Sequence, residues 1–401
     1  MEQRYVINND LLNDFDVENV INCTKNYSKT QLSQYLKKRF DGSYLLVAEQ
    51  VELFEKLKHK LPQWAAAGCL VTRKSLEQCS SPALASFKAG LVKGHTLIDL
   101  SGGLGVDDVA FGKQFKKVFS VDPDQELNEL VRYNFNRLLI KNIDRIDADA
   151  EGFAEAVQTP VDVFYIDADR RPSSNAKVFT LEDSSPDVIR LMPVLVEKSN
   201  LVMLKLSPMV DLKLVMNTFG NCSGIYVVGV KNEVKEVLVI LGKGKQDPVM
   251  QAVEVNADGK VIHRFPAAEN PVSSILPKEG MAYFYEPSNM IIKAGLSVPY
   301  AAAVGLAVVN KNSHYAVSTK LVNDYFGRSF NVIYHGVFSK SVVKTYLKQN
   351  DISKANVSAR NFVSTVEEIR QTFTIDDGGE EYLFFTQDAA RNKLFWHCRK
   401  V

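Results

Sequence analysis

The residues best suited to chemistry in this chain are acids and glycines that follow two apolar segments. The first apolar segment stops at Asp99 and leads into a turn with three glycines, Gly102, Gly103 and Gly105. The second stops at Asp122. Glycines let the backbone approach a ligand closely, and an acid at the end of the second strand can bond both ribose hydroxyls. The pattern predicts a nucleoside-binding site of the Rossmann type.

Charges beside the glycine turn discriminate between two nucleoside cofactors. A dinucleotide-binding turn reads G-x-G-x-x-G, whereas here Asp108 stands at the third glycine position and Asp107 precedes it. Carboxylates at the start of a helix would repel a pyrophosphate. S-adenosylmethionine has no phosphate and a positive sulfonium, so these acids are compatible with it. The sequence favours methyl transfer over hydride transfer and leaves a dehydrogenase as a distant alternative.

Further acids follow the next two apolar segments. Asp149 follows the third and could bond the amino edge of adenine, and Asp167 follows the fourth and could orient an acceptor or take its proton. Arg170 and Arg171 come next and could hold a substrate phosphate, or equally form structural salt bridges with neighbouring acids. Ligands of open α/β sheets bind at this carboxyl edge. These positions are therefore candidates for the acceptor side of the site.

The elements that must position these residues alternate between strand and helix over residues 95–242. Strands are expected at 96–100, 117–121, 143–147, 161–166, 200–206, 225–230 and 235–241, and helices near 106–114, 124–140, 150–157, 184–197 and 208–218. The last two strands form an expected hairpin. This predicts an α/β fold, with the Rossmann-like seven-stranded sheet of methyltransferases rather than the dehydrogenase sheet.

Three other regions flank this predicted domain. Residues 1–94 are expected to form a helical N-terminal region. Residues 243–325 are expected to form a small middle α+β domain of ferredoxin-like type, and residues 326–401 a second compact α+β domain. The length of 401 residues is consistent with several domains.

Several motifs resemble the successive motifs of class I S-adenosylmethionine-dependent methyltransferases. They are Asp99-Leu-Ser-Gly-Gly-Leu-Gly-Val-Asp107, Val121-Asp122, Asp149-Ala150 and Tyr165-Ile-Asp167. Ser101 stands where the family motif D-x-G-x-G-x-G has its first glycine. The wider chain is similar to a bacterial family of methyltransferases with a C-terminal THUMP-like domain, through segments such as Lys205-Leu-Ser-Pro-Met209. The fourth motif of that family reads D-P-A-R-R, and here it is Asp167-Ala-Asp-Arg-Arg171.

The resemblance implies a cofactor, a partner and roles for these residues. S-adenosylmethionine would be held by Asp99, Ser101, Gly102, Gly103, Gly105, Asp122, Asp149 and Asp167. Asp167, Arg170 and Arg171 would serve catalysis. THUMP modules bind RNA, so the implied substrate is tRNA or rRNA. Because no cysteine nucleophile stands in the expected motifs, a nitrogen or oxygen acceptor is favoured over cytosine C5.

Basic and aromatic residues in the C-terminal part are compatible with RNA binding. The basic residues are Lys311, Lys320, Arg328, Lys340, Lys344, Lys348, Lys354, Arg360 and Arg370, with Tyr325, Phe326, Phe330 and Tyr334 among them. The alternative is that the lysines are merely solvated and the aromatic rings form core.

Bulk composition excludes other classes of protein. The formal net charge is +1 and 46% of residues are hydrophobic, so any basic surface must be local. No signal peptide, membrane span or metal site is expected, and the scattered cysteines predict a cytoplasmic protein. Two alternatives to an RNA methyltransferase stay open: a cofactor-binding RNA-interaction protein without turnover, and a small-molecule methyltransferase. The sequence does not predict the oligomeric state.

Overall fold

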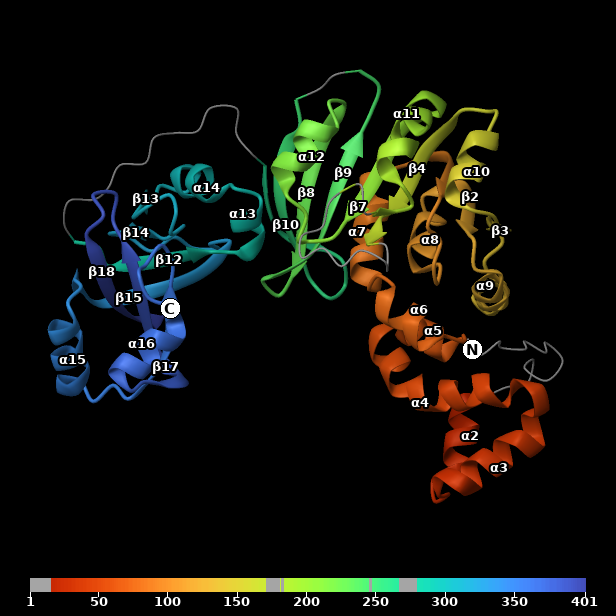
Figure 1. Ribbon diagram of the computed structural model, residues 1–401, viewed down its shortest axis with the longest axis horizontal. Coiled ribbons are helices and arrows are strands. Elements are labelled where there is room, and N and C mark those ends of the chain that lie inside the picture. The colour runs from red at the N-terminus through yellow and green to blue at the C-terminus, as the bar shows by residue number, and fades with distance from the viewer. Residues whose placement is uncertain (1–15, 171–180, 182–183, 245–246, 267–279) are drawn as a thin grey trace. The chain divides into compact units, whose positions relative to one another are not determined.

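The computed structural model describes residues 16–170, 181, 184–244, 247–266 and 280–401 (Figure 1). Two compact units are present. The first lies within residues 1–225, 236–248 and 255–262, and the second within 226–235, 249–254 and 263–401. Each unit has hydrophobic clusters of its own.

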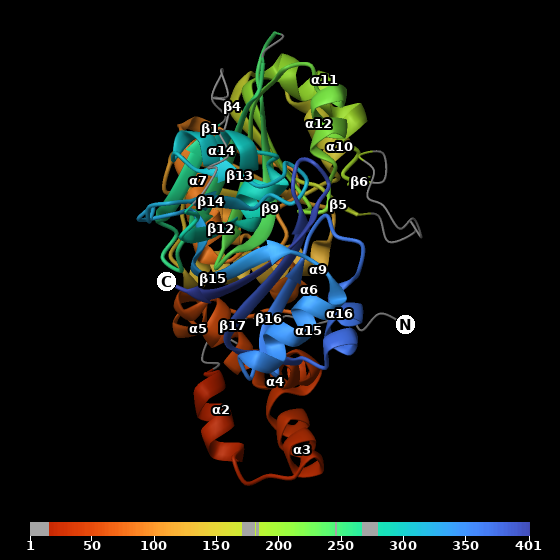
Figure 2. The same cartoon turned by 90° about the vertical axis from the view of Figure 1, so that its left-hand side faces the viewer.

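The described N-terminal part is helical, as predicted. Its helices are α2 (Val17–Thr24), α3 (Lys29–Phe40), α4 (Tyr44–Lys60), α5 (Pro62–Ala66), α6 (Arg73–Gln78) and α7 (Pro82–Leu91), with a short 3-10 turn η1 (Asp41–Ser43). Ser28 and Thr72 each form a capping box, which satisfies backbone donors at the starts of α3 and α6. In Figure 2, α2 and α3 lie near α4, and their apolar residues join its cluster.

A parallel sheet carries the predicted nucleoside-binding residues. Its parallel strands are β1 (Gly94–Asp99), β2 (Phe115–Asp122), β3 (Ile143–Asp147), β4 (Val161–Asp167) and β7 (Ser199–Leu206). Strand β9 (Glu233–Leu241) is antiparallel to β7 and lies between it and β8 (Cys222–Val230). The predicted α/β sheet with its closing hairpin is therefore confirmed.

Over the described residues the sheet has nine strands, since β10 (Val249–Val255) and β11 (Val261–Pro266) extend the order to β3-β2-β1-β4-β7-β9-β8-β10-β11. The seven strands predicted from sequence thus form only part of it. Two short strands, β5 (Asp169–Arg170) and β6 (Ser184–Ser185), pair separately.

Helices connect the parallel strands, and most begin at an acid. They are α8 (Val106–Phe111), α9 (Gln125–Arg137), α10 (Ala150–Ala156), α11 (Val188–Lys198) and α12 (Leu212–Thr218). Asp124, Asp149, Asp187 and Asp211 cap the last four through backbone N–H groups. Such caps fix where each strand-to-helix connection turns at the carboxyl edge of the sheet.

The second unit is built around a seven-stranded sheet of order β13-β14-β12-β15-β18-β17-β16. The strands are β12 (Tyr283–Pro287), β13 (Ala307–Val308), β14 (Ala316–Ser318), β15 (Gly327–Val337), β16 (Lys354–Ala359), β17 (Asp376–Gln387) and β18 (Lys393–Lys400). The helices are α13 (Asn289–Lys293), α14 (Ser297–Ala303), α15 (Lys340–Gln349) and α16 (Val366–Phe373). Because β12 pairs with β15, the domain boundary expected near residue 325 falls inside this sheet.

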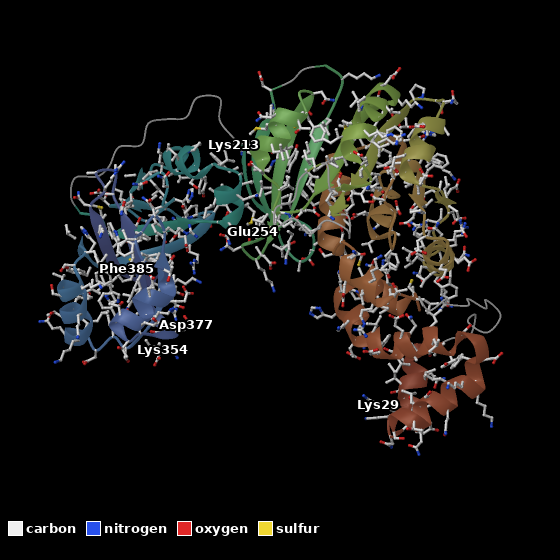
Figure 3. All side chains as sticks on the ribbon, viewed as in Figure 1. Lys29, Lys213, Glu254, Lys354, Asp377 and Phe385 are labelled. Atoms are coloured by element: carbon white, nitrogen blue, oxygen red, sulfur yellow. The ribbon has the colours of Figure 1, made fainter. Side chains whose placement is uncertain are left out.

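Aromatic side chains form much of the core of the second unit. The Phe384 ring packs on those of Phe284 and Phe330, with centroids 4.5 and 5.0 Å apart. Phe385 belongs to a second cluster, and Figure 3 shows it within the unit, whereas Lys354 and Asp377 lie at its margin. Of the aromatic residues considered for base stacking, Tyr325, Phe326 and Phe330 are buried. The core alternative is therefore correct for those three.

Candidate functional site: the carboxyl edge of the parallel sheet

The glycine turn has the backbone geometry that its sequence predicts. Gly103 and Gly105 have φ values of 50° and 86°, in the left-handed region that favours glycine. Position 101 has room for a side chain, and the serine hydroxyl there forms hydrogen bonds. Its backbone N–H and Oγ donate to Asp99 Oδ1 at 2.7 and 2.9 Å, and its Oγ accepts from the Asp167 N–H at 2.6 Å. Ser101 thus connects the ends of β1 and β4.

A buried guanidinium supports the turn from below. Arg145, on β3, donates from Nη2 to the Gly103 carbonyl at 2.8 Å and from Nη1 to Ser120 Oγ at 2.7 Å. Its Nε donates to Asn128 Oδ1 at 2.6 Å, and the side chain is fully buried. A Cβ at Gly102 would lie 2.1 Å from Arg145 Nη1 and 2.4 Å from Ser120 Oγ. Gly102 is therefore required by the cation beneath it.

Asp99 and Asp108 form a buried pair of carboxyl groups. Burial, with the nearby Asp108 as a second cause, raises the pKa of Asp99 well above its usual value. Burial also raises the pKa of Asp108, to about 6, against the opposing charge of Arg145. Asp108 Oδ2 accepts from Ser120 Oγ and lies 3.8 Å from Arg145 Nη1, and Asp99 Oδ1 accepts from Ser101. The pair therefore carries less negative charge than two free carboxylates.

Asp107 belongs to a buried ionic cluster. Its Oδ2 lies 2.9 Å from Lys88 Nζ and accepts from the Tyr165 hydroxyl at 2.9 Å. Lys88 is fully buried and also lies 3.3 Å from Glu236 Oε2. Burial works against ionisation of Asp107, but Lys88 and Lys205 outweigh it and lower its pKa.

These contacts correct the charge argument made from the sequence. Asp107 is paired with a buried lysine, and Asp108 is fully buried beside Arg145 and Ser120, so neither presents a free carboxylate at the start of α8. Their repulsion of a pyrophosphate is smaller than the sequence predicts. The choice of cofactor therefore depends on the sheet and the remaining acids.

Asp122 and Asp149 occupy different settings. Asp122 Oδ2 accepts from the Gly103 N–H at 2.9 Å, and Oδ1 accepts from the Asp124 N–H at 3.0 Å. Each carboxylate oxygen has a second lone pair, so Asp122 can still accept from ribose hydroxyls. Asp149 is exposed and caps α10 through the Gly152 N–H at 2.7 Å.

Asp167 stands opposite Lys205 in the register of β4 and β7. Lys205 Nζ lies 2.5 Å from Asp167 Oδ2, and the two side chains are 17% and 24% exposed. Burial opposes the charge on Lys205, but the attraction of Asp167 and other acids raises its pKa. A partly accessible carboxylate held by a lysine can orient a donor group on an acceptor.

Of the two predicted arginines, only the backbone of Arg170 lies within the described residues. The backbone of Arg170 pairs with Ser184 in the short β5–β6 ladder. The Arg170 side chain and the whole of Arg171 fall outside the described residues. Their proposed contact with a phosphate therefore stays a prediction.

Most predicted cofactor residues are brought together. Ser101 links Asp99 at the end of β1 to Asp167 at the end of β4, and Gly103 bonds Asp122 at the end of β2. Arg145 on β3 bonds the Gly103 carbonyl, so residues from all four strands meet at this edge of the sheet. Within the described residues, the Asp149 side chain bonds the Gly152 N–H and makes no hydrogen bond to that group. The sequence did not predict the roles of Lys88, Arg145 and Glu236; a lysine or arginine inside an otherwise apolar helix or strand is the signal that could have indicated them.

Membrane-spanning helices and metal-binding clusters are absent from the described ranges. No helix there is long and apolar enough to cross a bilayer. No group of three or more His, Cys, Asp or Glu in the same ranges could hold a metal ion. His397 bonds Glu381 Oε2 at 2.5 Å and the Tyr346 hydroxyl at 2.8 Å.

Of the basic residues considered for RNA, three are engaged within the second unit. Arg328 and Arg360 both pair with the buried Glu286, with Arg360 Nη2 at 2.9 Å from Oε1. Arg370 pairs with Asp377. Lys344 and Lys348 are exposed on α15.

Comparison with known proteins agrees with this architecture. The chain is similar to a "putative methyltransferase" from Porphyromonas gingivalis W83, with 27% identity and a TM-score of 0.81 over 99% of this chain and 100% of that one. A second similar structure is SMU.1697c, "a putative methyltransferase" from Streptococcus mutans in complex with SAH. It is 17% identical, the match covers 41% of this chain and 99% of that one, and the TM-score is 0.31. An rRNA methylase from Streptococcus thermophilus is 14% identical over 41% and 95%, also with a TM-score of 0.31. Scores of 0.31 carry no functional argument.

Fold and site together define the class: an α/β chain with the sheet of class I methyltransferases and a glycine turn at its carboxyl edge. Residues 327–400 match the family described as THUMP domain-like, so the chain also carries a THUMP-like domain. That match includes β15 to β18 but not β12 to β14, which complete the same sheet. Among curated proteins, none matches the chain.

Proposed function

We propose that this protein is an S-adenosylmethionine-dependent methyltransferase that modifies a nitrogen or oxygen of a nucleotide in tRNA or rRNA. The observation that carries the proposal is the glycine turn at the end of β1 in a sheet whose strand β9 is antiparallel and lies between β7 and β8. That sheet is typical of methyltransferases rather than dehydrogenases. The similarity to the Porphyromonas gingivalis protein over 99% of the chain supports the same class.

The residues at this edge fit a cationic nucleoside. Asp122 retains acceptor capacity for ribose hydroxyls, and exposed Asp149 can accept from an adenine amino group. Asp99, Gly103 and Gly105 would seat the methionine part, with Ser101 and Gly102 shaping the turn. When bound, the cofactor supplies an electrophilic methyl group on a positive sulfonium.

Asp167 is the proposed catalytic carboxylate. Its backbone N–H is fixed by Ser101 and its Oδ2 by Lys205, so the remaining oxygen can accept a hydrogen bond from an acceptor amine or hydroxyl. Such orientation favours a near-attack geometry, which can supply much of the rate acceleration. Arg170 and Arg171 are proposed to hold a phosphate of the substrate strand.

RNA is the proposed substrate because of the THUMP-like domain at 327–400. A small-molecule methyltransferase would need no such domain. Deleting residues 326–401 is a poor test between these, because it removes the partner of β12 and breaks the second sheet. RNA dependence is better measured with the full chain.

The direct test is methyl transfer to RNA. The protein is incubated with methyl-labelled S-adenosylmethionine and total RNA from a strain that lacks its gene, and the RNA is digested to nucleosides. We expect label in one nucleoside, reduced at least tenfold by Asp167→Ala. Binding of S-adenosylhomocysteine with no label in any RNA would contradict the proposal and favour a binding protein without turnover.

A further inference from the structure

The second unit contains a pocket of its own. Its volume is about 850 Å³, within the range of roughly 300–1,000 Å³ typical of small-ligand sites. Three loops and a helix of the second unit form it: the β13–β14 connection, the segment after β16, the β17–β18 hairpin and α14. The first and last precede residues 327–400, so the pocket extends beyond the THUMP-like match.

The lining has the chemistry of a nucleotide site. Two cations, Lys311 and Arg391, stand with four side-chain amides, those of Asn310, Asn312, Asn361 and Gln387. The other four lining residues are apolar, and none is acidic. Cations suit a phosphate, amides can pair with the edge of a base, and aliphatic walls can cover its faces.

The loops that carry these groups are fixed to each other. Asn310 Nδ2 donates to the Asp388 carbonyl at 2.8 Å, which joins the β13–β14 connection to the β17–β18 hairpin. Both carboxylate oxygens of Asp388 accept from Asn392 at 2.8 Å, so this nearby acid is engaged within its own hairpin. The bond from Asn310 thus holds two of the loops of the pocket together.

Most polar side chains of the pocket lining are free to bond a ligand. Within the described ranges, no hydrogen bond or ion pair engages the side chains of Lys311, Asn312, Asn361, Gln387 or Arg391. Asn361 and Arg391 also have positive φ values of 52° and 67°, which side-chain-bearing residues rarely adopt. Five uncommitted polar groups around one hollow distinguish it from Arg328, Arg360 and Arg370, which are paired.

We propose that this pocket binds a nucleotide, with the phosphate on Lys311 and Arg391 and the base edge on the amides. The most direct source of this ligand is an unpaired nucleotide of the substrate RNA, and in this respect the inference rests on the proposed function. A free nucleoside monophosphate has the same chemistry. A phosphopeptide would use the cations but would not need the amides.

The test is binding by the full chain in solution. Fluorescence anisotropy measures affinity for labelled four-nucleotide oligoribonucleotides of each base, and calorimetry measures affinity for the four nucleoside 5′-monophosphates. We expect Lys311→Ala/Arg391→Ala to weaken nucleotide binding at least about tenfold, since charge-assisted bonds are lost. The matched control is Lys113→Ala/Lys116→Ala, which removes the same charge from two exposed lysines of the first unit and should change affinity less than twofold.

A second variant tests the amides separately from the charge. Asn361→Gln keeps the amide but displaces it, and it should change the ranking of the four bases more than the affinity for inorganic phosphate. Tighter binding of an oligonucleotide than of any monophosphate identifies a strand as the source, whereas equal affinities identify a free nucleotide. Both results support a nucleotide site.

Equal weakening by the pocket variant and the Lys113/Lys116 control would overturn the inference, as would binding of a phosphopeptide but no nucleotide. Failure here is separable from failure of the proposed function. If the wild-type protein still methylates RNA while the pocket variants bind oligonucleotides normally, only the pocket assignment fails. If no RNA is methylated or bound, both fail.

Discussion

Replacing Gly102 by alanine is the sharpest perturbation of the glycine turn. The added Cβ would lie 2.1 Å from Arg145 Nη1 and 2.4 Å from Ser120 Oγ, although real Cβ contacts are essentially never shorter than 3.0 Å. Arg145 has no exposed side-chain surface and donates to three acceptors, so it cannot move into solvent. The clash must therefore displace either the turn or the guanidinium.

The expected cost follows from what displacement would break. A hydrogen bond to a charged group contributes about 1.5–3 kcal/mol, and overpacking costs about 1–3 kcal/mol. Loss of one such bond together with overpacking gives a decrease of about 2.5–6 kcal/mol in the free energy of unfolding. Because the turn also carries Gly103, whose N–H donates to Asp122, affinity for S-adenosylhomocysteine should fall as well.

Urea unfolding followed by circular dichroism measures the stability, and calorimetry measures the affinity. Gly90→Ala is the matched control: Gly90 is exposed on helix α7 with nothing within 4 Å of the added Cβ. That variant should be more stable by about 0.5–1 kcal/mol, since alanine is the better helix former. A Gly102→Ala protein that unfolds and binds like the wild type would refute the role given to Arg145.

Three further predictions test the charges around the turn. Asp108 has a raised folded-state pKa of about 6, against an ordinary 3.8, so its contribution favours folding at low pH and is lost as pH rises from about 4 to 6. Asp108→Asn should flatten that part of the stability–pH curve in urea titrations, and an unchanged curve would contradict the buried pair. Lys205→Met should lower kcat at least tenfold and leave the affinity for S-adenosylhomocysteine within about threefold, because it frees Asp167 without touching the turn. An unchanged kcat in single-turnover assays would exclude a role of Lys205 in positioning Asp167. Lys88→Met leaves two buried acids without their cation and should cost about 3–5 kcal/mol in thermal or urea unfolding, against under 1 kcal/mol for exposed Lys58→Met; equal losses would show that the ionic cluster is not stabilising.

The parallel sheet could be predicted because its strands are nearly continuous apolar runs that end at acids or glycines. Asp99, Asp122 and Asp167 mark those ends in both the sequence and the structure. The sequence also predicted the β8–β9 hairpin, since a short polar link joins two apolar runs. The place of strands β10 and β11 in the same sheet depends on long-range pairing, which local patterns do not encode.

The supporting charges could not be predicted in the same way. Arg145 reaches Gly103, 42 residues away, and Lys88 reaches Glu236, 148 residues away, so neither pairing leaves a local signal. Asp107 and Asp108 looked like free carboxylates because their partners come from other elements. Basic residues gave a similarly mixed result: Arg328 and Arg360 serve Glu286, whereas Lys311 faces a pocket.

Titration of the purified chain with S-adenosylhomocysteine, and separately with NADH, tests the central claim most directly. Calorimetry should give saturable heat with the sulfur nucleoside at one site per chain and none with the dinucleotide. Uptake of NADH without any response to S-adenosylhomocysteine would contradict the account.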